Sequence, residues 1–356
     1  MSRENGVMAT GTAKIPRMAG VNDDEQARLD EKLRRELGDI VLTALADART
    51  EDIVLNPDSQ LWVKRQGEGF RAVGTMPPTQ ALSAIRTIAS QRRTVVNAEH
   101  PIIETELPID GSRIEGIDWP VVTQPIFAIR LRPKRIFTLE EYESTGILTE
   151  REDPLNRRRW RRAFFDSVRG LSHGEAIRVA VRERKNILIV GSTGSGKTTL
   201  VNAILEAINR MTPDDRVISI EDTMELQCPA RNYVDLRAVG PVTMLDCLRA
   251  CMRLKPTRIV VGEVRGAEAH VMLKAWNTGH PGGAATVHAN DAVSGLTRLE
   301  SLVAEATAAP QQSLIAEAVD LVVFIDEEAD LAAGRKVREL LVVTGYADGK
   351  YLVEYV

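Results

Sequence analysis

The sequence predicts an α/β protein of two domains, the second of which is built on a parallel sheet and carries a phosphate-binding loop. Three observations support this prediction. The chain has 356 residues, more than a typical single domain contains. Short apolar strands alternate with helical stretches after Leu171, which is the pattern of a parallel sheet covered by helices. One of these strands runs directly into the glycine-rich segment GSTGSGKT at residues 191–198.

The composition is that of a globular protein, because 44% of the residues are hydrophobic and 27% are charged. The net charge of −4 neither favours nor excludes nucleic acid as a partner. The three cysteines, Cys228, Cys247 and Cys251, do not form a disulfide pattern, so we expect a reducing, cytoplasmic compartment. Cys247 and Cys251 would share one helix face, where packed thiols are favoured over a metal site.

The first residues, 1–22, lack the apolar stretch of a secretory signal, and we expect them to form a flexible tail. No apolar run approaches the roughly 20 residues needed to span a bilayer. Any membrane association is therefore expected to be peripheral or to occur through partners.

Residues 23–133 are expected to form a small α+β N-terminal domain. A helical pattern runs from Leu29 to Leu45 near its start, and a second helix is expected over residues 77–93. Short strands are expected between these helices and again within residues 102–132, where apolar and polar residues alternate.

Residues 134–153 are charged and are interpreted as a linker, with one short helix from Leu139. Residues 154–356 are expected to form the phosphate-binding domain. Its strands are expected at residues 186–190, 217–220, 259–261, 284–287 and 321–325.

The glycine-rich segment fits the pattern GxxxxGK[ST] in full and predicts a P-loop. Glycines let the backbone curl so that successive N–H groups point at phosphate oxygens, and the following helix adds partial positive charge. Lys197 is expected to reach the β- and γ-phosphates of ATP, and Thr198 to offer its hydroxyl to Mg²⁺. The expected nucleotide-binding residues are Gly191, Ser192, Thr193, Gly194, Ser195, Gly196, Lys197, Thr198 and Thr199.

A P-loop needs acidic partners for the metal and for the attacking water, and these are expected at the carboxyl ends of neighbouring strands. Glu221 and Glu263 each follow an expected strand. The aspartate usual in a Walker B strand is absent, so Glu263 is the expected activator of water. Glu221 is expected near the metal and the water. The alternative for each is a solvated or capping carboxylate.

Two histidines, His280 and His288, bracket a glycine-rich turn and a short strand. His288 is expected to emerge at the end of that strand, close to the γ-phosphate or to Glu263. Either histidine alone is more often a packed residue than a site group, and the role of His280 stays open.

A basic stretch, RRRWRR at residues 157–162, precedes the expected P-loop domain core. It could contact anionic lipid, DNA or an acidic neighbouring subunit. A solvated helix face with Trp160 packed inward is the favoured interpretation.

Four segments in a fixed order, GSTGSGKT, ISIEDTMEL, RIVVGEVRG and GHPGGAATVHAN, resemble the motifs of the secretion traffic ATPase superfamily. Members of that superfamily drive type II secretion, type IV secretion, conjugation and type IV pili. The segments EDIVLNPDSQLWV, DGSRIEG and FAIRLRP are similar to its N-terminal domain, so the resemblance spans residues 25–345. The compact two-domain layout is similar to the type IV secretion branch and its conjugal transfer ATPases, and the cysteine-based metal module of type II enzymes is lacking.

The resemblance implies a RecA-like second domain, a homohexameric ring and a nucleotide bound between the two domains. It also implies partners among secretion components at the inner membrane, with the protein itself cytoplasmic and peripheral to that membrane. By motif position, Arg113 and Arg130 would carry guanidinium groups to the phosphates, with Arg132 as the alternative to Arg130. Arg253 and Arg265 match family arginines that act at the phosphates or between subunits.

One departure from the family pattern lies before the expected strand at residues 259–261. The family often has Arg-Pro-Asp there, whereas this chain has Lys255, Pro256 and Thr257. The missing aspartate puts a local cap or ion pair in doubt rather than hydrolysis.

Three functional classes remain as alternatives at this point: a mechanical secretion motor, a small-molecule kinase, and a nucleic-acid translocase or pilus-retraction motor on the same core. No lid or acceptor pocket for a kinase is recognisable. The transported substrate, the ring size and the direction of force are left open by the sequence.

Overall fold

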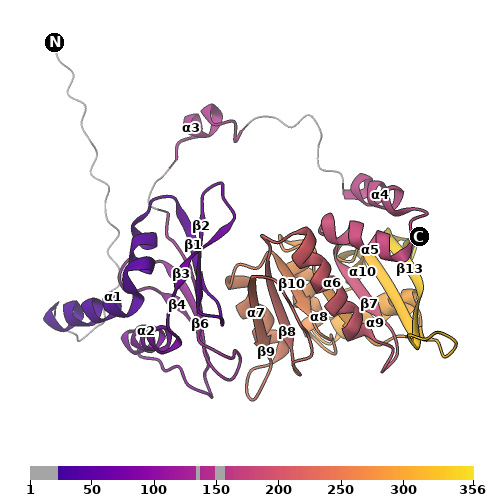
Figure 1. Ribbon diagram of the computed structural model, residues 1–356. Coiled ribbons are helices and arrows are strands. Elements are labelled where there is room, and N and C mark those ends of the chain that lie inside the picture. Colours follow the sequence, from indigo (N-terminus) through magenta and orange to yellow (C-terminus); the bar gives the residue numbers. More distant parts are fainter. Residues whose placement is uncertain (1–22, 134–136, 149–156) are drawn as a thin grey trace, which may run out of the picture.

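The computed structural model describes residues 23–133, 137–148 and 157–356, and the expected tail at residues 1–22 lies outside them. Two α/β units lie side by side, each around its own sheet, and the short helix α3 stands apart from both (Figure 1). The elements of the first unit and the linker are α1 (Asp23–Ala46), β1 (Thr50–Leu55), β2 (Gln60–Arg65), β3 (Phe70–Thr75), α2 (Pro78–Gln91), β4 (Ile102–Glu106), β5 (Arg113–Ile117), β6 (Ile126–Arg130) and α3 (Leu139–Ser144).

The second unit begins with helices α4 and α5 and ends with a long antiparallel hairpin. Its elements are α4 (Arg157–Val168), α5 (His173–Arg182), β7 (Ile187–Val190), α6 (Lys197–Met211), β8 (Arg216–Glu221), β9 (Asn232–Arg237), α7 (Met244–Arg253), β10 (Arg258–Val261), α8 (Glu268–Asn277), β11 (Ala284–Val287), α9 (Ala292–Ala304), α10 (Gln312–Ala318), β12 (Leu321–Glu327), β13 (Arg335–Ala347) and β14 (Lys350–Tyr355).

The first unit is an antiparallel sheet of order β3-β2-β1-β6-β5-β4, covered on one face by α1 and α2. Strand side chains alternate between the two faces. In β1, Ile53 therefore packs into the cluster that contains the helices, whereas Val54 packs into a cluster shared with the second unit. Its sheet is thus buried on both faces, one against its own helices and one against the other unit.

The second unit contains a sheet of order β14-β13-β12-β7-β11-β10-β8-β9, in which the strands from β12 to β9 run parallel. Helices α4, α5 and α6 cover one face, and α7 to α10 cover the other. This arrangement confirms the predicted α/β class. The five predicted strands are present, and β9, β13 and β14 are additional strands that the apolar pattern did not reveal.

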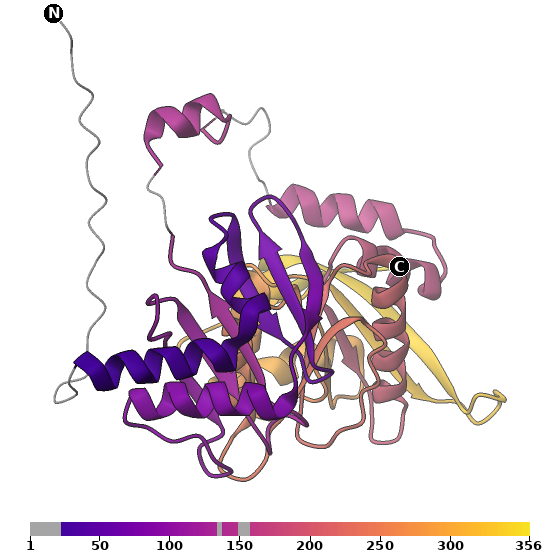
Figure 2. The same cartoon turned by 60° about the vertical axis from the view of Figure 1, so that its left-hand side comes forward.

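The two units meet where the first sheet covers the β9 edge and helix α7 (Figure 2). At the centre of this junction, the fully buried Arg216 donates to Asn56 Oδ1 at 2.6 Å, and Asn56 donates to Asn232 Oδ1 at 3.0 Å. The Arg216 guanidinium also lies over the Phe70 ring, 5.8 Å from its centroid. The main-chain N–H of Arg237 at the end of β9 donates to the carbonyl of Val121.

Part of the basic stretch is structural. Arg161 is buried and donates to the carbonyl oxygens of Val343, at 2.7 Å, and Val319. Arg162 pairs with Glu354. Arg161 is therefore buried and does not belong to the solvated helix face that the sequence favours, while the side chains of residues 157–160 lie outside the described part.

Two further expectations concern metal and membrane. Cys247 and Cys251 are fully buried in the core, as packed thiols are. Within the described ranges, no cluster of three or more histidine, cysteine or acidic side chains is arranged to hold a metal ion. Among these same residues, none of the helices combines the length and the apolar character that crossing a bilayer requires.

Candidate nucleotide-binding site

The P-loop connects β7 to α6 at the carboxyl edge of the parallel sheet. Gly194 and Gly196 have φ values of 82° and 95°, the left-handed region that glycine adopts without strain. Gly191 is needed for a different reason, because a Cβ there would collide with the carbonyl oxygen of Ile325. The helix begins at Lys197, as the sequence predicted, so its first N–H groups face the loop.

Lys197 is held inside the loop before any anion binds. Its Nζ donates to the carbonyl oxygens of Gly191, at 3.0 Å, and Ser192, at 2.7 Å. The same atom lies 3.3 Å from Nδ1 of His288. Burial lowers the pKa of the Lys197 ammonium, and the nearby carboxylate of Glu263 acts in the opposite direction. A bound phosphate oxygen would compete with these loop carbonyl groups for the N–H donors of Lys197.

A cavity of about 380 Å³ opens in front of this loop, and all of its lining comes from the second unit. Gly191, Ser192 and Ser195 shape the loop without lining the cavity. The lining residues are Thr193, Gly194, Gly196, Lys197, Thr198, Thr199, Glu221, Asp222, Thr223, Glu225, Gly262, Glu263, Arg265, Thr286, His288 and Arg335.

The strand order explains how Glu263 meets the loop. We expected the glutamate on a strand next to the P-loop strand, but β11 lies between β7 and β10. His288, just beyond β11, therefore stands between Lys197 and Glu263. Its Nε2 lies 2.9 Å from Oε1 of Glu263. An ammonium can only donate, so Nδ1 accepts from Lys197 and the ring proton sits on Nε2, from which it points at the carboxylate.

The other oxygen of Glu263 is held by Arg265, whose Nη2 lies 2.7 Å from Oε2. Arg265 also pairs with Asp222, which follows β8. Both oxygens of Glu263 thus have partners that orient the carboxylate from opposite sides. A carboxylate fixed in this way can orient a water molecule and accept its proton.

Glu221 ends β8 as a buried carboxylate whose Oε1 accepts from the N–H groups of Glu225 and Leu226, both at 3.0 Å. Burial raises its pKa, and these two hydrogen bonds oppose the rise. Its Oε2 is buried and has no hydrogen-bond partner in the described part of the chain. An added Cβ at Gly262 would lie 2.9 Å from Cγ of Glu221, so an aspartate at that position would displace the Glu221 side chain.

Glu221, Thr198 and Glu263 line the same cavity and supply two carboxylates and a hydroxyl. Oxygen donors of this kind fit Mg²⁺, which prefers one or two carboxylates together with substrate phosphates. The residues present therefore suit the metal that a P-loop nucleotide brings with it.

The expected arginines of the first unit lie elsewhere. Arg113 at the start of β5 and Arg130 at the end of β6 are register partners, and neither lines the P-loop cavity. Arg130 and Arg132 instead line a second cavity, of about 990 Å³, at the junction of the two units. Within one chain, the structure does not bring these arginines to the loop, so the expected nucleotide position between the two domains is not formed by a single chain.

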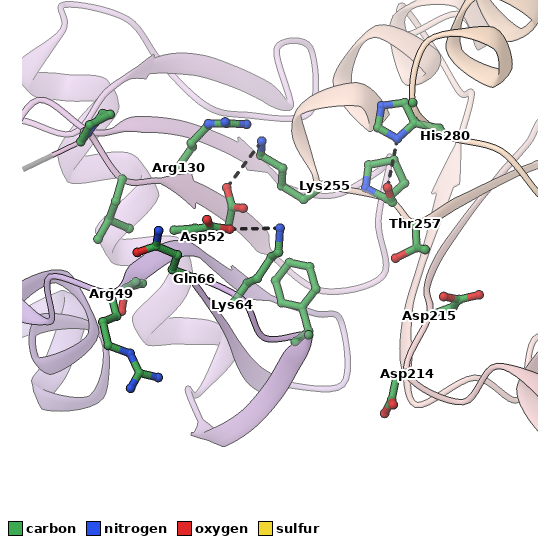
Figure 3. Close-up of a pocket in the computed structure, with 18 of the residues that line it drawn as sticks. Arg49, Asp52, Lys64, Gln66, Arg130, Asp214, Asp215, Lys255, Thr257 and His280 are labelled. Atoms are coloured by element: carbon green, nitrogen blue, oxygen red, sulfur yellow. Dashed lines mark hydrogen bonds and ion pairs between the residues drawn. The ribbon is translucent and has the colours of Figure 1, made fainter. Parts of the chain in front are cut away.

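Figure 3 shows this junction cavity, in which the side chains of Arg130 and Lys255 both extend close to Asp52. Lys255 Nζ lies 3.5 Å from Oδ1 of the buried Asp52. The backbone of Lys255 has a φ of 61°. A residue that departs from the family pattern therefore makes a contact between the two units. Burial raises the pKa of Asp52, while the neighbouring Lys255 and Arg130 lower it. Arg130 and Arg132 have no ion-pair partner among the described residues.

Two other candidate residues, Arg253 and His280, also lie away from the P-loop. Arg253 pairs with Glu104 of the first unit and does not line the P-loop cavity. His280 lines the junction cavity, where its Nδ1 lies 3.0 Å from the carbonyl oxygen of Pro256. Arg335 in β13 lines the P-loop cavity although no motif marks it, because its approach depends on the fold of a hairpin remote in sequence.

The chain was compared with known proteins. Residues 171–332 match the family described as Type II/IV secretion system protein. The conjugal transfer protein TrbB of Rhizobium radiobacter is 44% identical over 92% of this chain and 94% of its own length. The VirB11 protein of Bartonella henselae is 31% identical over 74% of this chain and 79% of its own length.

The fold is also similar to a solved structure, the VirB11 ATPase of Brucella suis in complex with sulphate. The TM-score is 0.80, with 25% identity over 90% of this chain and 97% of that one. The P-loop cavity and its acidic lining residues fit an ATPase, as these relatives do. The chain belongs to the type II/IV secretion system ATPase family.

Proposed function

We propose that this chain hydrolyses ATP as the motor of a type IV secretion system that serves conjugal transfer, with the P-loop cavity as its catalytic site. The observation that carries the proposal is the contact series from Lys197 through His288 to Glu263. It joins the phosphate-binding loop to a carboxylate suited to activating water. The similarity to conjugal transfer proteins over 92% of the chain supports the biological setting.

The chemistry follows from where each group lies. The loop amides and Lys197 would bind the phosphates, and a magnesium ion held by Thr198 and Glu221 would neutralise part of their charge. Glu263 would orient the attacking water and accept its proton, with His288 and Arg265 holding the carboxylate in place. The bond from the γ-phosphorus to the bridging oxygen breaks, and phosphate and ADP leave.

We further propose that the site is completed by a second copy of the chain. Each chain offers two unlike halves, a P-loop cavity and a junction cavity lined by Arg130 and Arg132, which have no ion-pair partner among the described residues. Unlike halves that meet head to tail generate a closed ring when the rotation between copies closes. A homohexamer at the inner membrane would place Arg113 and Arg130 of one copy at the phosphates held by the next.

The experiment mixes two inactive variants. Lys197→Ala chains keep the arginines but lose the loop cation, and Arg113→Ala/Arg130→Ala chains keep the loop but lose the arginines. In a ring that mixes freely, roughly one interface in four combines both intact halves. We therefore expect each variant alone to have little ATPase activity and the mixture to regain a substantial fraction of the wild-type rate.

The matched control is a mixture in which the double variant also carries Lys197→Ala, since no interface then has an intact loop. This control should stay inactive. Full activity of the Arg113→Ala/Arg130→Ala chain alone would show that these arginines do not take part. Lack of ATP hydrolysis by the assembled wild-type protein would remove the proposed function itself.

A further inference from the structure

The hairpin between β12 and β13 lies directly on the P-loop. The carbonyl oxygen of Ile325 closes over Gly191, and Ser192 donates its hydroxyl hydrogen to Asp326 at 3.2 Å. The hairpin and the loop therefore touch at the first residues of the loop.

Arg335, at the first residue of β13, projects from this hairpin into the P-loop cavity. Its Nη1 lies 3.4 Å from the hydroxyl of Thr199, in the first turn of α6. Its guanidinium also lies over Gly196, where any Cβ would collide with it. The glycine thus leaves room for the arginine as well as for the turn of the backbone.

Among the described residues, no carboxylate lies within 4.0 Å of the Arg335 guanidinium, although Glu327 is the register partner of Arg335 on β12. Arg338, three residues further along β13, differs from Arg335 in its ion pairing and in its position relative to the cavity. It pairs with Glu328 at 2.9 Å, donates to the carbonyl oxygen of Glu327, and does not line the cavity. An exposed guanidinium beside a phosphate-binding loop, with no anion of its own, is suited to an anionic ligand.

We infer that Arg335 is a nucleotide-binding residue that contacts the phosphates nearest the ribose, from the side of the loop opposite Glu263. This inference deepens the proposed function and rests on it. In a P-loop, the lysine reaches the β- and γ-phosphates, while the loop amides and the start of the helix cradle the α- and β-phosphates. Arg335 lies beside Thr199 on that second side, and His288 and Glu263 flank Lys197 on the first.

The position of Arg335 predicts a distinct kinetic effect of its substitution. A group that binds the α- and β-phosphates contacts ATP, the transition state and ADP alike, so its loss weakens binding without slowing the chemical step. Arg335→Ala should therefore raise KM and leave kcat nearly unchanged. It should raise the dissociation constants of ADP and of an ATP analogue by the same factor.

The test measures dissociation constants by calorimetry for MgADP and for a magnesium complex of a non-hydrolysable ATP analogue, on the full chain. One charge-assisted hydrogen bond corresponds to a change of about tenfold or more in affinity, which we expect for Arg335→Ala with both ligands. Arg335→Lys should recover part of the loss. Arg338→Ala, the matched control on the same strand, should bind both ligands as the wild type does.

Unchanged binding of both ligands by Arg335→Ala would overturn the inference. So would a loss confined to the ATP analogue, which would put the guanidinium at the γ-phosphate instead. An equal loss in Arg338→Ala would show that the hairpin acts only through its fold. The proposed function fails separately, if the wild type binds neither ligand or if Lys197→Ala binds both as tightly as the wild type.

Discussion

The P-loop cavity and the junction between the two units treat charge in opposite ways. In the cavity, the Lys197 ammonium donates to carbonyl oxygens of its own loop. Among the described residues, one oxygen of Glu221 has no hydrogen-bond partner and no carboxylate lies within 4.0 Å of Arg335. At the centre of the junction, Arg216 is fully buried and is held by Asn56, Asn232 and the carbonyl oxygen of Leu254. The cavity keeps bonding capacity for a ligand, whereas this central cluster uses its hydrogen bonds to fix the two units against each other.

This contrast separates what substitutions should change. Groups in the cavity should alter turnover or ligand affinity with little effect on unfolding, because a ligand can replace their partners. Arg216 and its partners at the centre of the junction should alter the free energy of unfolding with little effect on nucleotide affinity, because a buried polar group that loses its partner is destabilising.

The largest expected effect is that of Glu263→Gln on hydrolysis. The amide keeps the shape of the side chain but cannot accept the proton of water, so we expect turnover to fall by about a hundredfold or more. Nucleotide affinity and the melting temperature should stay close to those of the wild type. Steady-state ATPase assays and calorimetry on the same preparation measure both.

Glu206→Gln is the control for Glu263→Gln, because Glu206 pairs only with Arg210 on the exposed side of α6. It should leave turnover unchanged. Wild-type turnover in Glu263→Gln would show that the water is activated by another group and would remove the central contact series from the mechanism.

A smaller effect, on stability alone, is expected for Asn56→Ala. Arg216 then loses an acceptor in a fully buried position, and the free energy of unfolding should fall by about 1–3 kcal/mol. Asn56→Asp keeps an acceptor for Arg216 and should lose less. Thermal unfolding measures the stability of both variants. A change in MgADP affinity as large as that of the cavity variants would show that the centre of the junction also acts on nucleotide binding.

A further effect is the pH dependence of stability at Glu115 of β5, which is 3% exposed at the junction and whose Oε2 has no hydrogen-bond partner among the described residues. Burial raises the pKa of this carboxyl from 4.5 to about 8, opposed by Arg253 and supported by Glu104. Between these values the unfolded chain has lost the proton and the folded chain keeps it. Stability is therefore lost as pH rises through this window, by at most about 1.4 kcal/mol per pH unit.

Glu115→Gln removes that dependence, because the amide does not titrate. From pH 5 to pH 8, the melting temperature of the variant should increasingly exceed that of the wild type, and the difference should be smallest at pH 5. A difference that is constant across this range would mean that Glu115 is ionised in the folded protein.

Much of the site could be predicted because it is local in sequence. The P-loop needs only consecutive residues: glycines at positive φ, a lysine, a threonine and the start of a helix. The apolar strand before it and the acidic residues that follow two other strands were also visible. These features determined the fold class and the residues Lys197, Thr198, Glu221, Glu263 and His288, all of which the structure brings to one cavity.

The tertiary structure alone decided which side chains complete these groups. The placement of β11 between β7 and β10 puts His288 in contact with both Lys197 and Glu263, and strand order leaves no periodic trace in sequence. Arg335 reaches Thr199 across 136 residues, through the assembly of the sheet rather than through any motif. Arg253 was matched to a family arginine at the phosphates or between subunits but pairs with Glu104 of the first unit, and Lys255 pairs with Asp52 there, because the junction sets their surroundings.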